Sequence, residues 1–200
     1  LSQASGRRIQ LANDADCFAV SEAADGAGQN FRTVFGVILG TGCGGGFVVD
    51  GKILSGPNAI AGEWGHNPIP WAIDIERPGP TCYCGKKGCI ETFVSGPGLS
   101  QAFQNLTGEN LTTDKIAELA ESGHKQAEHI ISLLENRLAR ALASTINILD
   151  PHAIVLGGGL SNIDRLYINI PRLWSQWVFS DDVTTPLLNN KHGDSSGVRG

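Results

Sequence analysis

The sequence has no excess of positive charge and no long apolar segment. It contains 15 lysines and arginines against 20 aspartates and glutamates, a formal net charge of −5. A nucleic-acid-binding surface usually needs a basic stripe, so this balance argues against such a partner. No apolar stretch approaches the roughly 20 residues of a membrane-spanning helix, and no secretory signal pattern opens the chain. We therefore predict a cytoplasmic protein without nucleic-acid or membrane partners.

The chain also lacks an initiating methionine, an internal repeat and any low-complexity segment. It begins at Leu1 and stops at Gly200 within a glycine-bearing stretch typical of a loop, and we expect it to be part of a longer protein. Its 200 residues suffice for one large domain, and 41% hydrophobic residues allow a real core. The 26 glycines gather in a few segments, which is typical of binding sites built from backbone.

Apolar patterning predicts an α/β fold. In the first third we expect strands over 8–12, 34–39, 47–49 and 52–54, with a helix over 15–24. The last two strands flank Asp50 and Gly51, a strong type I′ hairpin signal.

The remainder is predicted to be a long functional loop followed by helices. Glycine- and proline-rich residues 55–98 form the loop. A broad apolar stripe predicts a helix over 125–149, and a buried strand follows over 153–156. We expect Ser161 to cap the next helix.

Three cysteines, Cys82, Cys84 and Cys89, stand within eight residues, and His66 lies upstream. Thiolates and imidazole are the ligands of tetrahedral zinc, and four protein ligands make a closed, structural site. A reducing compartment favours metal over disulfides. The alternatives are a disulfide between two of the three cysteines, or free thiols in a turn.

Three acidic residues lie beside these features. Glu63 and Glu91 bracket the metal loop and could accept hydrogen bonds from sugar hydroxyls; the alternative is ordinary surface glutamates. Asp14 lies at a predicted helix N-terminus, where the helix dipole favours the ionised form. An ionised aspartate can accept a hydroxyl proton in phosphoryl transfer. The alternative is an ordinary aspartate of a first helical turn.

Two glycine-rich segments follow predicted strands. Residues 41–46 are predicted to form a loop whose amides could face phosphate oxygens, or a plain turn before the hairpin. No Gly-Lys-Ser/Thr follows, so this is not a P-loop. Residues 157–159 form the second segment, which could approach a nucleotide or simply allow close helix–strand packing. It is not a dinucleotide fingerprint, because residue 162 is asparagine.

Taken together, these motifs resemble those of ROK-family sugar kinases. The matching segments cover nearly the whole chain in order: 11–14 (LAND), 40–44 (GTGCG), 62–66 (GEWGH), 82–91 (CYCGKKGCIE), 148–151 (ILDP), 154–159 (IVLGGG) and 191–200 (KHGDSSGVRG). The sequence His66-Asn67-Pro68-Ile69-Pro70-Trp71 and the long insert before Cys82 resemble most the bacterial fructokinase, or manno(fructo)kinase, branch.

The resemblance implies an actin-like (ribonuclease H-like) fold in which ATP and sugar meet between two domains. Residues 1–200 would form mainly the large domain with the hinge segment, including a zinc-binding loop at about 62–91. The implied roles are Asp14 as catalytic base; Asn13, Glu63, His66 and Glu91 as sugar ligands; His66, Cys82, Cys84 and Cys89 as zinc ligands; Thr41, Gly42 and Gly44 in the phosphate loop; and Gly158 and Gly159 near the adenosine. Magnesium would accompany ATP, and family members are commonly dimers, so a homodimer is a possible assembly.

Family kinases open with an Asp-x-Gly-x-Thr phosphate loop, which this sequence lacks. We therefore expect the N-terminal small domain to be absent here and the chain alone to have little activity. The predicted reaction is ATP-dependent conversion of fructose to fructose 6-phosphate. Alternatives are a kinase of mannose, glucose or N-acetylglucosamine, a sugar-responsive ROK transcriptional repressor with an added helix-turn-helix, and a zinc-stapled sugar-binding module without catalysis.

Overall fold

The computed structural model describes residues 2–7 and 12–193. The strand predicted over 8–12 lies, except for Ala12, outside these residues, as do residues 194–200 of the last matching segment. Within the described ranges, no helix has both the length and the apolar character that a membrane span requires.

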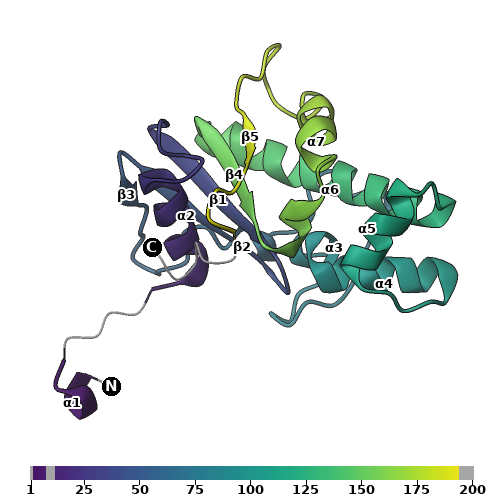
Figure 1. Cartoon of the computed structure of the whole chain (residues 1–200), viewed down its shortest axis with the longest axis horizontal. Helices are drawn as coiled ribbons and strands as arrows, with labels where there is room; N and C mark the ends of the chain where they lie inside the picture. The colour runs from purple at the N-terminus through teal and green to yellow at the C-terminus, as the bar shows by residue number, and fades with distance from the viewer. Residues whose placement is uncertain (1, 8–11, 194–200) are drawn as a thin grey trace.

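One mixed sheet of five strands forms the centre of the described chain (Figure 1). Its strands are β1 (Thr33–Leu39), β2 (Cys43–Val49), β3 (Lys52–Ile53), β4 (Ala153–Gly157) and β5 (Leu187–Asn189). Their order is β3-β2-β1-β4-β5; β2 is antiparallel to β1 and β3, whereas β4 is parallel to β1 and β5. Ile38 pairs with Gly157, so the carboxyl ends of β1 and β4 meet at one edge. In sheets of this kind, that edge is where ligands bind.

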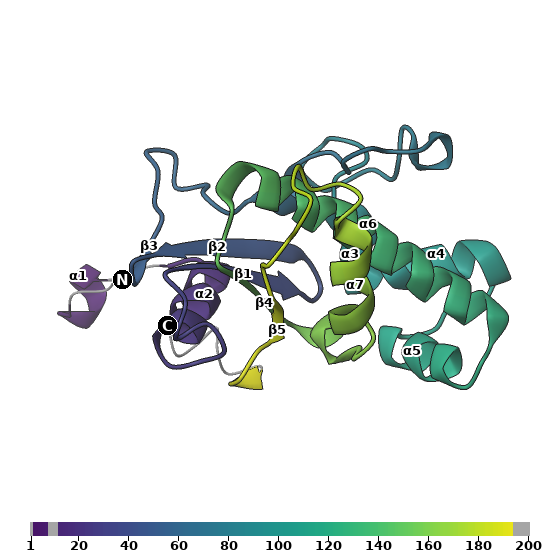
Figure 2. The ribbon, with the colours of Figure 1, turned by 90° about the horizontal axis from the view of Figure 1, so that it is seen from above.

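Helices cover both faces of the sheet (Figure 2). On one face, α2 (Asp14–Ala24) packs its Phe18 and Ala19 against Val34, Val48 and Val155. The other face carries the larger core, beneath α6 (Lys125–Leu149) and α7 (Leu166–Trp174). Successive strand residues point to opposite faces, so each strand supplies both cores. The remaining helices are α1 (Ser2–Ser5), α3 (Glu91–Val94), α4 (Gly96–Thr107) and α5 (Thr113–Glu121), with 3-10 helices η1 (Trp64–His66), η2 (Asp74–Glu76) and η3 (Gly159–Asn162).

Gly36 lies in β1 directly beneath α2, and a Cβ added there would lie 2.7 Å from Ala19 Cα and Cβ. Backbone would have to move to admit it. We expect Gly36→Ala to lower the free energy of unfolding by about 1–3 kcal/mol, as overpacking does, measured by urea denaturation. Gly56→Ala is the matched control, since nothing lies within 4 Å of a Cβ at Gly56. Equal losses in the two variants would contradict this account of the packing.

Most predicted elements are confirmed. The structure contains the helix that begins at Asp14, the strand over 34–39 and the helix over 125–149. The hairpin is also confirmed, because Asp50 and Gly51 have φ of 50° and 74°, as a type I′ turn requires.

Two local predictions are wrong. Gly44, Gly45 and Gly46 belong to β2 and not to a loop, and a Cβ on Gly44 would lie 3.1 Å from Ala15 Cβ. Gly44 and Gly46 let α2 approach the sheet, whereas Gly45 faces Phe35 and Trp64 on the other side. Ser161 does not cap a helix; it is buried in η3 and donates to Gly158 O at 2.7 Å, while α7 begins only at Leu166.

Candidate functional site

The N-terminus of α2 forms the first part of the site. Asn13 is the N-cap, a position that favours asparagine because its side chain can accept from a free helical amide. Its Oδ1 accepts from Ala15 N at 2.8 Å, and its Nδ2 donates to Glu63 Oε1 at 3.3 Å. The exposed carboxylate of Asp14 accepts from the same amide at 2.8 Å. The cap therefore holds Asn13 and Asp14 beside the segment that carries Glu63.

Glu63 is the N-cap of the short helix η1, and His66 is its last residue. Trp64 anchors this helix, because its buried indole donates to Gly44 O at 3.1 Å. Glu63 Oε2 lies 3.9 Å from His66 Nε2, and the hydroxyl of Tyr83 lies 2.8 Å from the same nitrogen. The imidazole thus turns one nitrogen toward Glu63 and Tyr83, and the other toward the cysteines.

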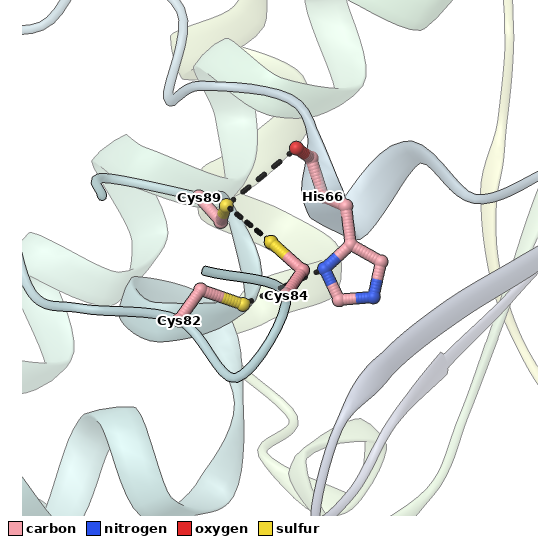
Figure 3. A group of neighbouring side chains, drawn as sticks. All are labelled: His66, Cys82, Cys84 and Cys89. Atoms are coloured by element: carbon pink, nitrogen blue, oxygen red, sulfur yellow. Dashed lines mark hydrogen bonds between the residues drawn. The ribbon is translucent and has the colours of Figure 1, made fainter. Parts of the chain in front are cut away.

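His66, Cys82, Cys84 and Cys89 converge as predicted, with their ligand atoms all within 4.8 Å of one another (Figure 3). Cys82 Sγ lies 3.5 Å from His66 Nδ1, and Cys84 Sγ lies 3.7 Å from Cys89 Sγ. All five cysteines of the chain are free thiols, so the disulfide alternative is not adopted.

These separations fit a tetrahedral metal ion. With metal–sulfur and metal–nitrogen bonds of about 2.3 and 2.0 Å, a tetrahedral ion holds two sulfurs about 3.8 Å apart and a sulfur and nitrogen about 3.5 Å apart. The observed distances of 3.7 and 3.5 Å match both values. Three thiols and one imidazole are also a donor set that suits zinc.

Glu91 connects the cysteine cluster to the turn after β1. Its Oε1 lies 3.8 Å from Cys82 Sγ, and its Oε2 accepts from Cys43 N at 3.0 Å. A Cβ on Gly42 would lie 2.8 Å from the same Oε2, so glycine leaves room for the carboxylate. Contacts thus run from Asn13 through Glu63, His66 and Cys82 to Glu91, and the structure brings together the predicted sugar ligands.

Asp16 is an acidic residue near Glu63 that the sequence analysis did not single out. Partial burial, reinforced by the nearby Glu63 carboxylate, raises the pKa of Asp16 above its ordinary value. The available signal was the pair of acids in the first turn of α2, Asp14 and Asp16. A second acidic group therefore faces the same region as Glu63.

A cavity of about 450 Å³ lies at the shared edge of β1 and β4. It is lined by Thr41 and Gly159, together with the first residues of α4 and α5: Gly96, Pro97, Thr112 and Thr113. Helix N-termini carry free amides and favour anions. An adjoining cavity of about 170 Å³ shares Thr113, Gly159 and Leu160 and is flanked by Asp114, Glu118 and Glu121. The caps Ser95 and Thr112 were the sequence signal for these two helix starts.

The predicted phosphate and adenosine residues separate into two groups. Thr41 and Gly159 line the larger cavity. Gly42 faces Glu91 instead, and Gly44 is packed in β2 against α2. Gly158, with φ of 80°, packs its Cα against Leu39, since a Cβ there would lie 2.6 Å from Leu39 O. Neither Gly44 nor Gly158 lines either cavity.

A sequence model described as the ROK family matches residues 1–200. An N-acetyl-D-glucosamine kinase from Photobacterium profundum is 43% identical over 98% of this chain and 66% of its own length. The chain spans about two thirds of the length of such curated relatives.

Solved structures share the fold. A ROK hexokinase from Thermus thermophilus superposes with a TM-score of 0.88 at 28% identity, over 100% of this chain and 65% of that one. A ROK-family glucokinase from Streptomyces griseus, in complex with glucose and AMPPNP, superposes with a TM-score of 0.85 at 27% sequence identity. The match covers 99% of this chain and 68% of that one. A ROK-family transcriptional regulator homologous to the E. coli MLC protein superposes with a TM-score of 0.83 at 26% sequence identity. The match covers 100% of this chain and 52% of that one. These likenesses confirm the predicted fold class.

Proposed function

The chain belongs to the ROK family, and on that premise we propose that the full-length protein transfers phosphate from ATP to a hexose, with N-acetylglucosamine preferred. The observation that carries the choice of sugar is the 43% identity to an N-acetyl-D-glucosamine kinase. The sequence analysis favoured fructose, and the comparisons do not support that branch. That preference rested on residues 66–71 and the insert before Cys82. Within the first of these segments, the carbonyls of Pro70 and Trp71 accept hydrogen bonds from Arg140 of α6, so these two residues have a packing role.

The acceptor sugar would bind where Asn13, Glu63, His66 and Glu91 meet. Two carboxylates, an amide and an imidazole offer the mixture of acceptors and donors that sugar hydroxyls need. Asp14 follows Asn13 directly and would accept the proton of the attacking hydroxyl as general base. The carboxylate is the form of this side chain that can take the proton.

The donor would bind in the two adjoining cavities at the carboxyl ends of β1 and β4. Two helix N-termini supply amides for phosphate oxygens in the larger cavity. The smaller cavity has acidic residues, Asp114 and Glu118, at its rim, which disfavours phosphates there and suits the uncharged base and ribose. Magnesium would accompany the nucleotide. Since the chain spans about two thirds of its relatives, we expect the 200 residues alone to phosphorylate sugar poorly.

Zinc at His66, Cys82, Cys84 and Cys89 would act structurally, because four protein ligands leave no open position for substrate. When bound, it supplies a fixed tetrahedral link between η1 and the cysteine turn. Since Glu63 and Glu91 border these two segments, the link would hold both carboxylates toward the sugar. The large domain over 1–200, the zinc loop over about 62–91, the homodimer and the cytoplasmic location stay predictions.

We expect Cys84→Ser to lose most of the bound zinc and to lower the thermal unfolding temperature, because a serine oxygen is a poor replacement for a thiolate. Metal content measured by mass spectrometry of the purified protein checks this. Cys17→Ser is the matched control, since Cys17 lies on α2 outside the cluster. Stoichiometric zinc in Cys84→Ser would contradict the ligand assignment.

The proposed reaction is tested with a panel of N-acetylglucosamine, glucose, mannose and fructose, each with ATP and Mg²⁺ and the full-length protein. We expect the highest kcat/KM for N-acetylglucosamine. A higher value for fructose would restore the branch first predicted, and no turnover with any of the four would refute the kinase proposal.

A ROK transcriptional regulator is the second candidate, favoured by the 0.83 TM-score to such a protein. The sugar-binding residues alone do not separate the two functions. Retention of Asp14 favours the kinase, because a regulator needs no general base. The full-length sequence would separate the two functions: an Asp-x-Gly-x-Thr phosphate loop ahead of these residues would support the kinase, and a DNA-binding helix pair would support the regulator.

A further inference from the structure

Tyr83 occupies an unusual position in the turn between two candidate zinc ligands. Tyr83 is 84% exposed. Its hydroxyl nevertheless lies 2.8 Å from His66 Nε2, and its ring meets the imidazole edge-on, with 5.0 Å between the two ring centroids. Among residues 2–7 and 12–193, the hydroxyl makes no other hydrogen bond. The imidazole therefore holds an otherwise solvated side chain beside His66, one of the proposed sugar ligands.

His66 Nε2 can form a good hydrogen bond with only one partner at a time. The other ring nitrogen, Nδ1, points into the cysteine cluster, 3.5 Å from Cys82 Sγ. A neutral imidazole that gives Nδ1 to a metal carries its proton on Nε2, and that N–H forms one good hydrogen bond. Tyr83 OH takes this bond at 2.8 Å, whereas Glu63 Oε2 is 3.9 Å away.

We propose that Tyr83 is a positioning residue that competes with the acceptor sugar: its hydroxyl holds His66 Nε2 in the sugar-free protein and must leave before a sugar hydroxyl can bind there. This inference rests on the proposed function, in which His66 is a sugar ligand. This exchange is compatible with the exposure of Tyr83, because its hydroxyl can form hydrogen bonds with water as soon as it leaves the imidazole. Sugar affinity is therefore weaker than the site's own contacts would allow.

The test is Tyr83→Phe, which removes the competing oxygen and keeps the ring against the imidazole. We expect the KM for the sugar in the full-length protein, and the Kd of the sugar by calorimetry, to fall by about two- to tenfold, the value of one hydrogen bond. The kcat and zinc content should stay within error of wild type. Damage to the turn weakens binding, so a gain in affinity separates competition from a merely structural role.

Lys87→Ala is the matched control, because Lys87 is exposed on the same turn. We expect its KM to equal that of wild type. An unchanged or higher Kd in Tyr83→Phe, in a protein whose wild type binds sugar, overturns this inference alone. A wild type that binds none of the four sugars overturns the proposed function, and the inference with it.

Discussion

The full-length Asp14→Asn variant is expected to lose about 10²- to 10⁴-fold in kcat for sugar phosphorylation, the usual contribution of a positioned general base. Asparagine keeps the size and polarity of the side chain but cannot accept the hydroxyl proton. The fold should survive, because the N-cap is Asn13 and not Asp14. Steady-state kinetics with N-acetylglucosamine and ATP give kcat, and calorimetry gives the Kd of the sugar, which should change little.

Asp16→Asn is the comparison for this experiment. It removes a carboxylate from the same helical turn, two residues further on, where Asp16 is partly buried near Glu63. We expect a smaller loss of kcat than in Asp14→Asn. Equal losses in the two variants would argue that the general charge of the turn matters and not a base at Asp14.

The second large effect concerns stability and Glu76, which is 2% exposed at the end of η2. Arg140 donates to both of its oxygens, at 2.7 and 2.9 Å, and Arg137 adds a third bond at 2.9 Å. Arg140 also donates to the carbonyls of Pro70 and Trp71 at 2.9 Å each. One buried ion network therefore attaches the segment after His66 to α6.

We expect Glu76→Gln to lower the free energy of unfolding by about 3–5 kcal/mol, because it leaves the buried Arg140 without an anionic partner. Urea denaturation of wild type and variant measures the difference. Asp74→Asn is the matched control in the same 3-10 helix, since its exposed pair with Arg77, at 3.7 Å, contributes little. A loss below about 1 kcal/mol in Glu76→Gln would contradict a stabilising role for the network.

The same variant should alter the acid stability of the protein. Burial alone would raise the pKa of Glu76, but the hydrogen bonds from Arg140 and Arg137 outweigh it and hold the pKa below its ordinary value. A depressed folded-state pKa contributes stability above the ordinary pKa of 4.5, and that contribution is lost as the pH falls toward the folded-state value. Between pH 7 and pH 3, the stability of wild type should therefore decline more steeply than that of Glu76→Gln.

The sequence predicted best those features that depend on neighbours along the chain. The helix α6 was predicted with its observed ends, because a continuous apolar stripe runs to Asp150 and Pro151, where the backbone reaches φ of 41° and cannot continue the helix. The convergence of His66, Cys82, Cys84 and Cys89 was predicted because three of these four residues lie within eight residues of the sequence.

Features that depend on distant partners were missed or misplaced. The glycines of β2 resemble a loop until α2 is seen packed against them. The strand β5 has only three residues and exists through its pairing with β4. Glu76 and Arg140 are 64 residues apart, so nothing local marks them as a pair. The preference for the fructokinase branch rested on residues 66–71 and the insert before Cys82, and the curated relatives reported above are N-acetyl-D-glucosamine kinases instead.

The close approach of α2 to the sheet has a mechanical consequence. At its closest points the contact is made by Gly36, Gly44 and Gly46 against Ala15 and Ala19, whose side chains have no rotamer to change. Because the backbones lie so close at these points, sliding α2 along the sheet would produce clashes, and we expect Asp14 to move together with the strands. Any closure over bound ligands would have to bring other segments to this carboxylate.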